Sequence, residues 1–455
     1  DLSVSQDPSE RLFHAVVAAL RDAGDGGLSV GELGHRLGDA AVGRTALRGV
    51  LKALCRDGRA VRVDRDLYAA APQALAEQVR AAAADDEAAA ADAAPMTRAE
   101  ARERALRFVD PDDTNVRTLL DQLAHGLDVD RPFTDEAARE AERARAPLRS
   151  DEAGDDLTHL GFVTIDGADA KDFDDAVFAE PLEGGVVRLW VGIADVSAYV
   201  AADGPLDADA RERGCSMYFP GRVYPMLPFH LADDVCSLRP DALRRCAWVR
   251  MDIDAAGVVV GEDFGFGVMR SRARLTYDTV QDVLDGRAQS PHADMLRLLD
   301  ALRARLFERR RARGMLDMDL PEPRVALTAD GLDVAELEPY PRLSSHRLIE
   351  ECMLVTNETV AAFLIREGWP ALFRVHGEPS VDRLRAIRPV LLRIAPSVRL
   401  PEVPRPADLE RAIEAAAGSA ASSVVSSLIL RSLPRAQYSV TPSLHFGLGT
   451  DQYLH

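Results

Sequence analysis

Five aspartates crowd into the segment VTIDGADAKDFDDAV at residues 163–177, between two apolar and partly β-branched flanks. They are Asp166, Asp169, Asp172, Asp174 and Asp175. Carboxylates this close repel one another, and burial would drive several of them to take up protons unless a cation offsets their charge. Hard divalent ions such as Mg²⁺ prefer carboxylate oxygens and commonly bridge them to substrate phosphates. The segment therefore indicates a loop around one or two metal ions beside a phosphodiester, where the metal would activate water and stabilise the leaving oxygen.

Two other interpretations of these aspartates have to be weighed. A calcium loop of the EF-hand type needs Gly at its sixth position. Counting from Asp166 that position is Lys171, so the calcium-loop interpretation fails. A solvated acidic turn is the usual fate of clustered aspartates, although here apolar residues adjoin both sides. In an extended segment Asp172 and Asp174 would share one side, and Asp175 would point away unless the backbone turns there. The residues alone leave the metal site and the solvated turn both open.

The elements that must position this loop are strands and long helices. From about residue 107 onward the sequence mixes the two, and residues 186–200 and 247–261 have the pattern of paired strands. Residues 295–314 and 346–368 carry the apolar spacing of long helices. In the second of these, polar side chains fall near one stripe of an otherwise apolar helix, which is often only the solvent face.

Residues 12–70 follow a different plan, with three predicted helices and a small hairpin, which is typical of a winged helix-turn-helix unit. Ser29 and Glu32 form a capping box that opens the second helix. The third helix carries an apolar face and, opposite it, a basic stripe of Arg44, Arg48, Lys52 and Arg56. The stripe favours a helix that contacts nucleic acid. A solvated face and a protein-binding module are the alternatives.

The composition of the chain limits its possible partners and its cellular location. The chain of 455 residues has a net charge of −19, which argues against adhesion to nucleic acid over the whole surface but allows a local basic channel. Its five cysteines form no C-x-x-C pair, which indicates a reducing cytoplasm without disulfides or a zinc site. No apolar run of about 18 residues is present, so we expect no membrane span. We expect a cytoplasmic monomer.

The segment TIDGADAKDFDDAV, with the blocks that follow it, resembles the signature of the RNase II/RNB family of exoribonucleases. The likeness continues to the end of the chain through GIADVSAYV (192–200), SMYFPGRVYPMLPFHLADDVCSLRP (216–240), RGMLDMDLPE (313–322), SHRLIEECMLVTNE (345–358), FRVHGEP (373–379) and HFGLGTDQYLH (445–455). The resemblance implies a mixed α/β RNB-type catalytic domain over residues 151–455. The winged helix-turn-helix unit would precede it at residues 1–72, and residues 73–150 would form an Ala-rich, charged linker with a helical lead-in.

The resemblance also implies an activity, which is Mg²⁺-dependent, processive hydrolysis of single-stranded RNA from the 3′ end to 5′ nucleoside monophosphates. Mn²⁺ is a possible substitute for Mg²⁺. By the same analogy Asp166 and Asp175 would be metal ligands, with Asp172 supporting the metal site. Asp174 would bind or orient a second ion or the attacking water. Asp169 lies outside the motif and is expected to be a solvated loop residue.

RNA-binding residues are implied in the same way. Tyr218 matches the family tyrosine that stacks on the terminal base, and Met318 stands where an aromatic partner is usual. A thioether can still pack against a base, although more softly. Tyr277 and Glu350 match residues that help to recognise ribose, and Glu351 is an alternative to Glu350.

The sequence departs from the family at both ends. The family continues after the block that ends at His455 with an arginine-containing motif and a C-terminal OB-fold, so the sequence is expected to be incomplete. A helix-turn-helix-like unit also stands where paired cold-shock barrels are usual. Because of these departures, an alternative function remains open. The protein would then be a non-catalytic winged-helix regulator that binds RNA or DNA and carries a degenerate nuclease body. The intact carboxylate set favours the enzyme.

Overall fold

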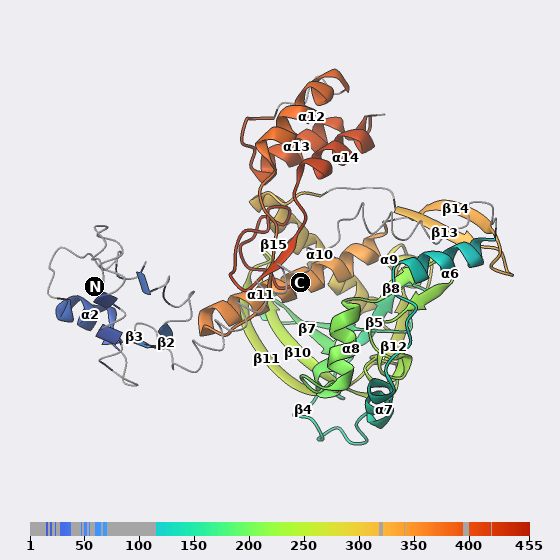
Figure 1. The fold of residues 1–455 in the computed structure, drawn as a ribbon, viewed down its shortest axis with the longest axis horizontal. Helices are drawn as coiled ribbons and strands as arrows, with labels where there is room; N and C mark the ends of the chain where they lie inside the picture. The colour runs from blue at the N-terminus through green and yellow to red at the C-terminus, as the bar shows by residue number, and fades with distance from the viewer. Residues whose placement is uncertain are drawn as a thin grey trace. The chain divides into compact units, whose positions relative to one another are not determined.

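A computed structural model describes residues 115–317, 322–340, 342–394, 400–419 and 421–455. Within the first 70 residues it describes positions 15, 16, 19, 20, 23, 28–37, 47, 50, 51, 54, 60–64 and 67–70. The chain divides into two compact units, residues 1–101 with 364–370, and residues 102–363 with 371–455 (Figure 1).

The first unit contains a three-stranded sheet in the order β1-β3-β2. Its elements are β1 (Leu28–Ser29), α2 (Val30–Arg36), β2 (Ala60–Asp64) and β3 (Leu67–Ala70). The predicted hairpin is confirmed, since β2 pairs with β3 in antiparallel register. The predicted capping box is confirmed as well, since the Glu32 amide donates to Ser29 Oγ at 3.2 Å and the Ser29 amide donates to Glu32 Oε2 at 2.8 Å.

Apolar positions expected on the first and third helices form the core of this unit. Val16, Leu20, Leu47, Leu51 and Leu54 are all buried. The basic stripe of Arg44, Arg48, Lys52 and Arg56 lies outside the described residues. The winged helix-turn-helix arrangement as a whole therefore stays a prediction.

The second unit is built on a mixed seven-stranded sheet in the order β12-β5-β6-β7-β10-β11-β4. Its strands are β4 (Asp155–Asp156), β5 (Val163–Asp166), β6 (Asp175–Pro181), β7 (Val187–Ala194), β10 (Leu243–Ile253), β11 (Val259–Arg270) and β12 (Ala273–Thr276). The strands from β5 through β11 pair antiparallel, whereas β12 and β4 join the two edges in parallel. The predicted pairing is confirmed where β7 lies beside β10. Residues 247–261 are not one strand, because a turn with Gly257 at φ 75° separates β10 from β11.

Three helices pack on one face of this sheet (Figure 1). They are α9 (Tyr277–Leu284), α10 (Ala293–Arg313) and α11 (Ser344–Glu367). The two long helices were predicted, with ends that differ by one or two residues. Burying aliphatic side chains from both layers supplies the main driving force for folding. Residues such as Val177, Val191, Leu299 and Leu348 are fully buried there.

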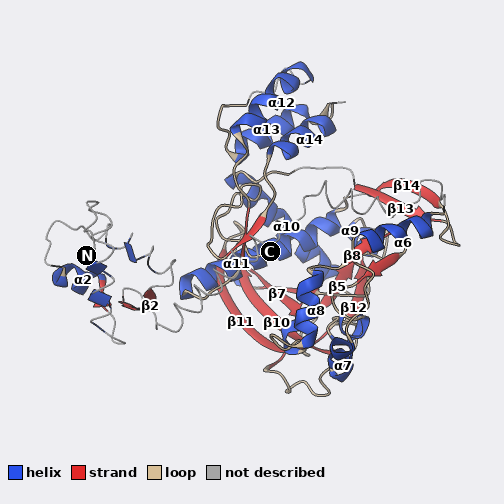
Figure 2. Cartoon of the chain, viewed as in Figure 1, coloured by secondary structure: helices blue, strands red, loops and turns tan. Residues whose placement is uncertain are grey.

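The second unit contains further helices and strands (Figure 2). They are α6 (Val116–Gly126), α7 (Asp135–Arg143), α8 (Pro205–Arg213), β8 (Met217–Phe219), β9 (Arg222–Tyr224), β13 (Glu322–Leu327), β14 (Val334–Tyr340), β15 (Phe373–Val375), α12 (Val381–Ile394), α13 (Pro406–Ala416), α14 (Ser422–Ser432) and β16 (Gln437–Ser439), with a π-helical turn at His230–Val235. Among the described helices, none combines the length and the apolar character that crossing a bilayer requires.

Candidate active site

The four motif aspartates lie on one loop between neighbouring strands. Asp166 ends β5 and Asp175 begins β6, and the connection between them carries Asp172 and Asp174. Because β5 and β6 pair antiparallel, at Val163 and Val177, the end of β5 and the start of β6 lie at the same end of the strand pair. We call residues 166–175 the aspartate loop.

The charges of these carboxylates act on one another. Burial raises the pKa of Asp175 to about 7, and the charges of Asp166 and Asp174 add to the shift. Burial likewise raises the pKa of Asp166 to about 6, with Asp174 and Asp172 contributing in the same direction. Asp174 stays open to solvent on one side, yet the protein packed around it and the charge of Asp172 raise its pKa to about 6. The loop thus brings all four carboxylates, Asp175 included, into electrostatic contact.

Two of these carboxylates have the features expected of ligands to a hard cation. Asp166 Oδ2 and Asp175 Oδ2 are both buried and have no hydrogen-bond partner in the described part of the protein. A buried carboxylate oxygen without a partner is costly unless a cation or donor satisfies it. The donor set therefore fits Mg²⁺ or Mn²⁺.

The carboxylate oxygens of the loop do not converge on a single point. Among the described residues, no three His, Cys, Asp or Glu side chains already surround a position that a metal ion could occupy. Asp172 accepts a hydrogen bond from Tyr218 instead. Sharing an ion would require these side chains to rotate toward one another.

Tyr218 stands beside the carboxylates on the short hairpin of β8 and β9. Its side chain is 65% exposed, and its hydroxyl donates to Asp172 Oδ2 at 2.7 Å. Partial burial of the hydroxyl, followed by the bond to Asp172, raises the pKa of Tyr218 to about 12. The ring is therefore available for stacking, while its hydroxyl is held at the aspartate loop.

Tyr277 and the two candidate glutamates differ in their surroundings. Tyr277 begins α9 directly after Thr276, which lies opposite Asp166 in the pairing of β12 with β5, and its ring stacks on His346 with centroids 4.0 Å apart. Glu351 is buried and forms a bidentate ion pair with Arg310, at 2.5 and 2.9 Å. Glu350 is part-exposed on α11, which leaves it as the more accessible of the two glutamates.

Met318 lies outside the described residues. The residue before it, Asp317, is held by two arginines, Arg342 at 3.0 Å and Arg347 at 3.0 Å. Its backbone amide also donates to Glu410 Oε2 at 2.8 Å. The chain that leads into Met318 is therefore fixed by side chains from several elements.

Sequence reasoning missed the side chains that brace the aspartate loop. Ser237 is buried, accepts from the Phe173 amide at 3.0 Å and donates to the Lys171 carbonyl at 2.7 Å. These bonds fix the backbone on both sides of Asp172. Arg274 is the cation whose charge lowers the pKa of Asp166, against the other influences on that group. Ser237 lies in the block 216–240 and Arg274 lies outside the motif blocks. The hydrogen-bond partners of both are backbone groups, which no residue pattern specifies.

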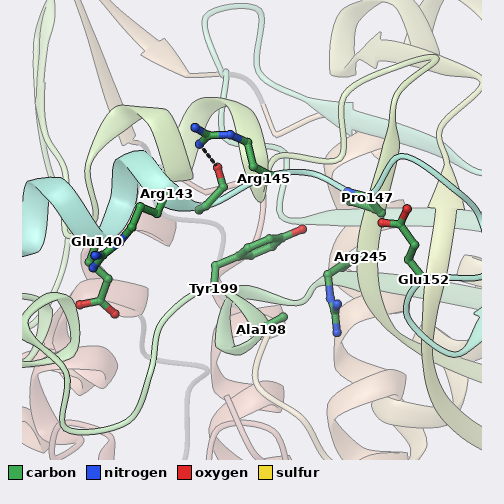
Figure 3. Close-up of a pocket in the computed structure, with 9 residues that line it drawn as sticks. Glu140, Arg143, Arg145, Pro147, Glu152, Ala198, Tyr199 and Arg245 are labelled. Carbon is green, nitrogen blue, oxygen red and sulfur yellow. Dashed lines mark hydrogen bonds between the residues drawn. The ribbon is translucent and has the colours of Figure 1, made fainter.

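A separate pocket of about 400 Å³ lies between the end of α7, the connection to β4 and the segment around Tyr199 (Figure 3). Its charged lining consists of Arg143, Arg145, Arg245, Glu140 and Glu152. Of the predicted site residues that the structure describes, none lines it. Its arginines are offset by two glutamates, so the pocket is not a strongly cationic site.

Comparisons with known proteins agree with this geometry. A family model described as "RNB domain" matches residues 155–455. Ribonuclease R of Escherichia coli (strain K12) is 39% identical over 305 residues, which are 66% of this chain and 37% of that protein. Ribonuclease R of Thermotoga maritima is 35% identical over 353 residues, which are 76% of this chain and 50% of that protein. This chain thus spans half or less of the length of these curated relatives.

Solved structures show the same fold. Mycoplasma genitalium RNase R, solved in complex with ribose-methylated single-stranded RNA, superposes with a TM-score of 0.68 at 25% identity, over 76% of this chain and 55% of that one. Yeast Ssd1, a pseudonuclease, shares the fold with a TM-score of 0.53 at 17% identity, over 71% of this chain and 39% of that one. The resemblance based on the motifs is confirmed, and the family model covers well over half of the sequence. The chain belongs to the RNB family.

Proposed function

We propose that this chain carries the catalytic centre of a metal-dependent 3′→5′ exoribonuclease, which hydrolyses single-stranded RNA processively to 5′ nucleoside monophosphates. The observation that carries the proposal is the pair of buried carboxylate oxygens on Asp166 and Asp175, which have no partner among the described residues. They lie on the loop whose Asp172 is hydrogen-bonded to the exposed Tyr218. The relatives named Ribonuclease R, and the RNA-bound structure of one of them, support RNA as the substrate.

The roles that we propose for the four aspartates are those that the family resemblance implies, and the burial of Asp166 and Asp175 agrees with them. Asp166 and Asp175, with the orphaned oxygens, would hold Mg²⁺ or Mn²⁺, and Asp172 would support the site. Asp174, which stays open to solvent, would hold a second ion or orient the attacking water. A bound metal would lower the pKa of the attacking water and stabilise the leaving oxygen. The loop supplies a fixed backbone and several carboxylates within electrostatic reach.

Substrate recognition would fall to side chains around the loop. The exposed ring of Tyr218 would stack on the terminal base, with Met318 as its partner. Stacking tolerates any base, which suits a nuclease without sequence preference. Tyr277 and Glu350 would contact ribose, whose 2′-hydroxyl separates RNA from DNA.

A labelled oligoribonucleotide tests this function. With Mg²⁺, the protein should release mononucleotides from the 3′ end and leave a short resistant remnant. A matched oligodeoxyribonucleotide should be a poor substrate, and EDTA should stop the reaction. Internal cuts, or equal activity in EDTA, would overturn the assignment. A regulator that only captures RNA would bind the oligomer without shortening it, and the retained carboxylate set speaks against that rival.

The N-terminal unit has a separate proposed role. We infer that residues 1–72 form a winged helix-turn-helix module that contacts nucleic acid through Arg44, Arg48, Lys52 and Arg56. Replacing all four by Ser should weaken RNA binding and flatten its salt dependence, because fewer counterions are released. Turnover on a saturating short substrate should barely change. An unchanged salt slope would assign the module to protein binding or to structure.

We also propose that the protein is cytoplasmic, because its scattered cysteines form no C-x-x-C pair. We propose in addition that it acts as a monomer.

A further inference from the structure

Arg274 lies on the edge strand β12, next to the strand that carries Asp166. In the parallel pairing of β12 with β5, Arg274 is opposite Thr164. Its side chain reaches past the end of β5, and Nη2 donates to the carbonyl of Gly167 at 2.5 Å and to the carbonyl of Ala168 at 2.7 Å. A single guanidinium thus grips the backbone immediately after Asp166.

The same guanidinium also contacts the far part of the aspartate loop. Its carbon lies 5.5 Å from the ring centroid of Phe173, which stands between Asp172 and Asp174 and is only 7% exposed. A cation over an aromatic face at this distance is attracted by the ring quadrupole. Arg274 therefore contacts the loop at its beginning and near its end.

Arg274 donates its hydrogen bonds to these carbonyl groups and leaves the carboxylate of Asp166 open. An arginine that gripped Asp166 directly would neutralise it and occupy the oxygens that a metal needs. By binding the carbonyls, Arg274 adds a positive charge that acts on Asp166, while Oδ2 of that residue keeps no hydrogen-bond partner in the described part of the chain. This arrangement stabilises a loop of like charges without blocking it.

We propose that Arg274 is a positioning residue for the metal-binding carboxylates, fixing the backbone of the aspartate loop so that Asp166 and its neighbours can converge on an ion. The inference rests on the proposed function of the loop. Residues that hold ligands in place, without touching the metal, typically change metal affinity or activity by about 10- to 100-fold when they are replaced.

The chain offers a matched control two residues earlier. Arg272 also donates to backbone carbonyls, those of Thr158 and Leu160, on a segment that precedes the aspartate loop. Arg272→Gln removes the same kind of bond from the same neighbourhood. Arg274→Lys keeps the positive charge on a single ammonium group but loses the planar guanidinium.

The test measures Mn²⁺ affinity in the absence of RNA, by electron paramagnetic resonance, together with kcat and KM on a short oligoribonucleotide. Arg274→Gln should weaken Mn²⁺ binding and lower kcat, each by about 10-fold or more, with KM changed by about twofold at most. Arg274→Lys should recover part of both losses, and Arg272→Gln should leave both at the wild-type value. Melting curves of the three variants check that each is folded.

The outcomes separate this inference from the function on which it rests. If the wild-type protein neither binds Mn²⁺ nor shortens RNA, the proposed function falls and the inference falls with it. If the wild type does both and Arg274→Gln matches it in Mn²⁺ affinity, only the role of Arg274 is overturned. Equal losses in Arg272→Gln and Arg274→Gln would also overturn it, because they would indicate general destabilisation.

Discussion

The aspartate loop and the hairpin that carries Tyr218 face each other across one hydrogen bond, yet they are built differently. The loop connects β5 and β6 of the large sheet, and the side chains of Ser237 and Arg274 fix its backbone from two directions. The hairpin consists of two strands of three residues, and Tyr218 is 65% exposed. Hydrolysis needs charges at fixed positions, whereas stacking on any base needs only an open aromatic face.

The two regions also differ in how their charges affect folding stability. Several carboxylates of the loop repel one another at partly buried positions, which opposes folding until a cation is bound. The hairpin carries no such cluster of like charges among its described residues. Its contacts include the hydrogen bond from Tyr218 to Asp172 and the ion pair of Arg222 with Asp121. Variants of the loop should therefore separate activity from stability, and variants of the hairpin should change RNA binding with little effect on either chemistry or folding.

The largest effect is expected at Asp174. Asp174→Asn keeps size and hydrogen bonding but removes one charge where we place the second ion or the attacking water. Turnover should fall on the order of 100-fold or more, while RNA affinity holds or rises because repulsion of the phosphates is reduced. Asp169→Asn, at an exposed position of the same loop, should cost little. Single-turnover rates and RNA dissociation constants for the two variants measure this. Near-wild-type rates in both would mean that the aspartates of this loop are not the catalytic centre.

The next effect concerns Tyr218 and separates stacking from its bond to Asp172. Tyr218→Ala should raise the Kd for single-stranded RNA about 5- to 150-fold, since one stacked base contributes about 1–3 kcal/mol. Tyr218→Phe keeps the ring and should bind RNA within about threefold of wild type. Filter-binding titrations on an Asp174→Asn background prevent degradation during the measurement. If Ala and Phe bind equally well, the ring does not stack on RNA.

Stability gives a smaller effect of opposite sign. Asp175→Asn removes a buried charge whose Oδ2 has no partner among the described residues, so the metal-free protein should become more stable, on the order of 1–2 kcal/mol. Urea unfolding measures the difference. Added Mg²⁺ should reduce this difference in unfolding free energy, because only the wild type keeps the Asp175 carboxylate as a metal ligand. Loss of stability in the variant, with and without Mg²⁺, would argue that Asp175 is satisfied within the protein itself.

Much of this site could be predicted from sequence, and the exceptions have physical causes. The direction of Asp175 stayed open because side chains alternate regularly only within a strand, and the residues between β5 and β6 lie outside any strand. Adjacent positions on a helix point about 100° apart, and the choice between Glu350 and Glu351 depends on Arg310 from another helix. The partners of Arg274 and Ser237 are backbone groups of distant residues, which local patterns do not specify.

The smallest effect tests how the hairpin is held. Arg222 on β9 forms an ion pair with Asp121 of α6, a helix that precedes the part of the chain matched by the family model. The same helix is fixed to the turn between β13 and β14, where Arg117 donates to the Asp330 carbonyl at 2.7 Å. Because Asp121 and Arg222 are each nearly half exposed, their coupling should be only about 0.2–1 kcal/mol.

A double-mutant cycle measures that coupling. Asp121→Asn and Arg222→Gln should each raise KM for RNA about two- to threefold and leave kcat unchanged, and the double variant should be no worse than either single one. Asp207→Asn breaks another exposed pair, with Arg211 on α8, and should change neither constant. A fall in kcat in the Asp121 variant would mean that α6 also affects the aspartate loop, and that the separation between the catalytic and the stacking region is not complete.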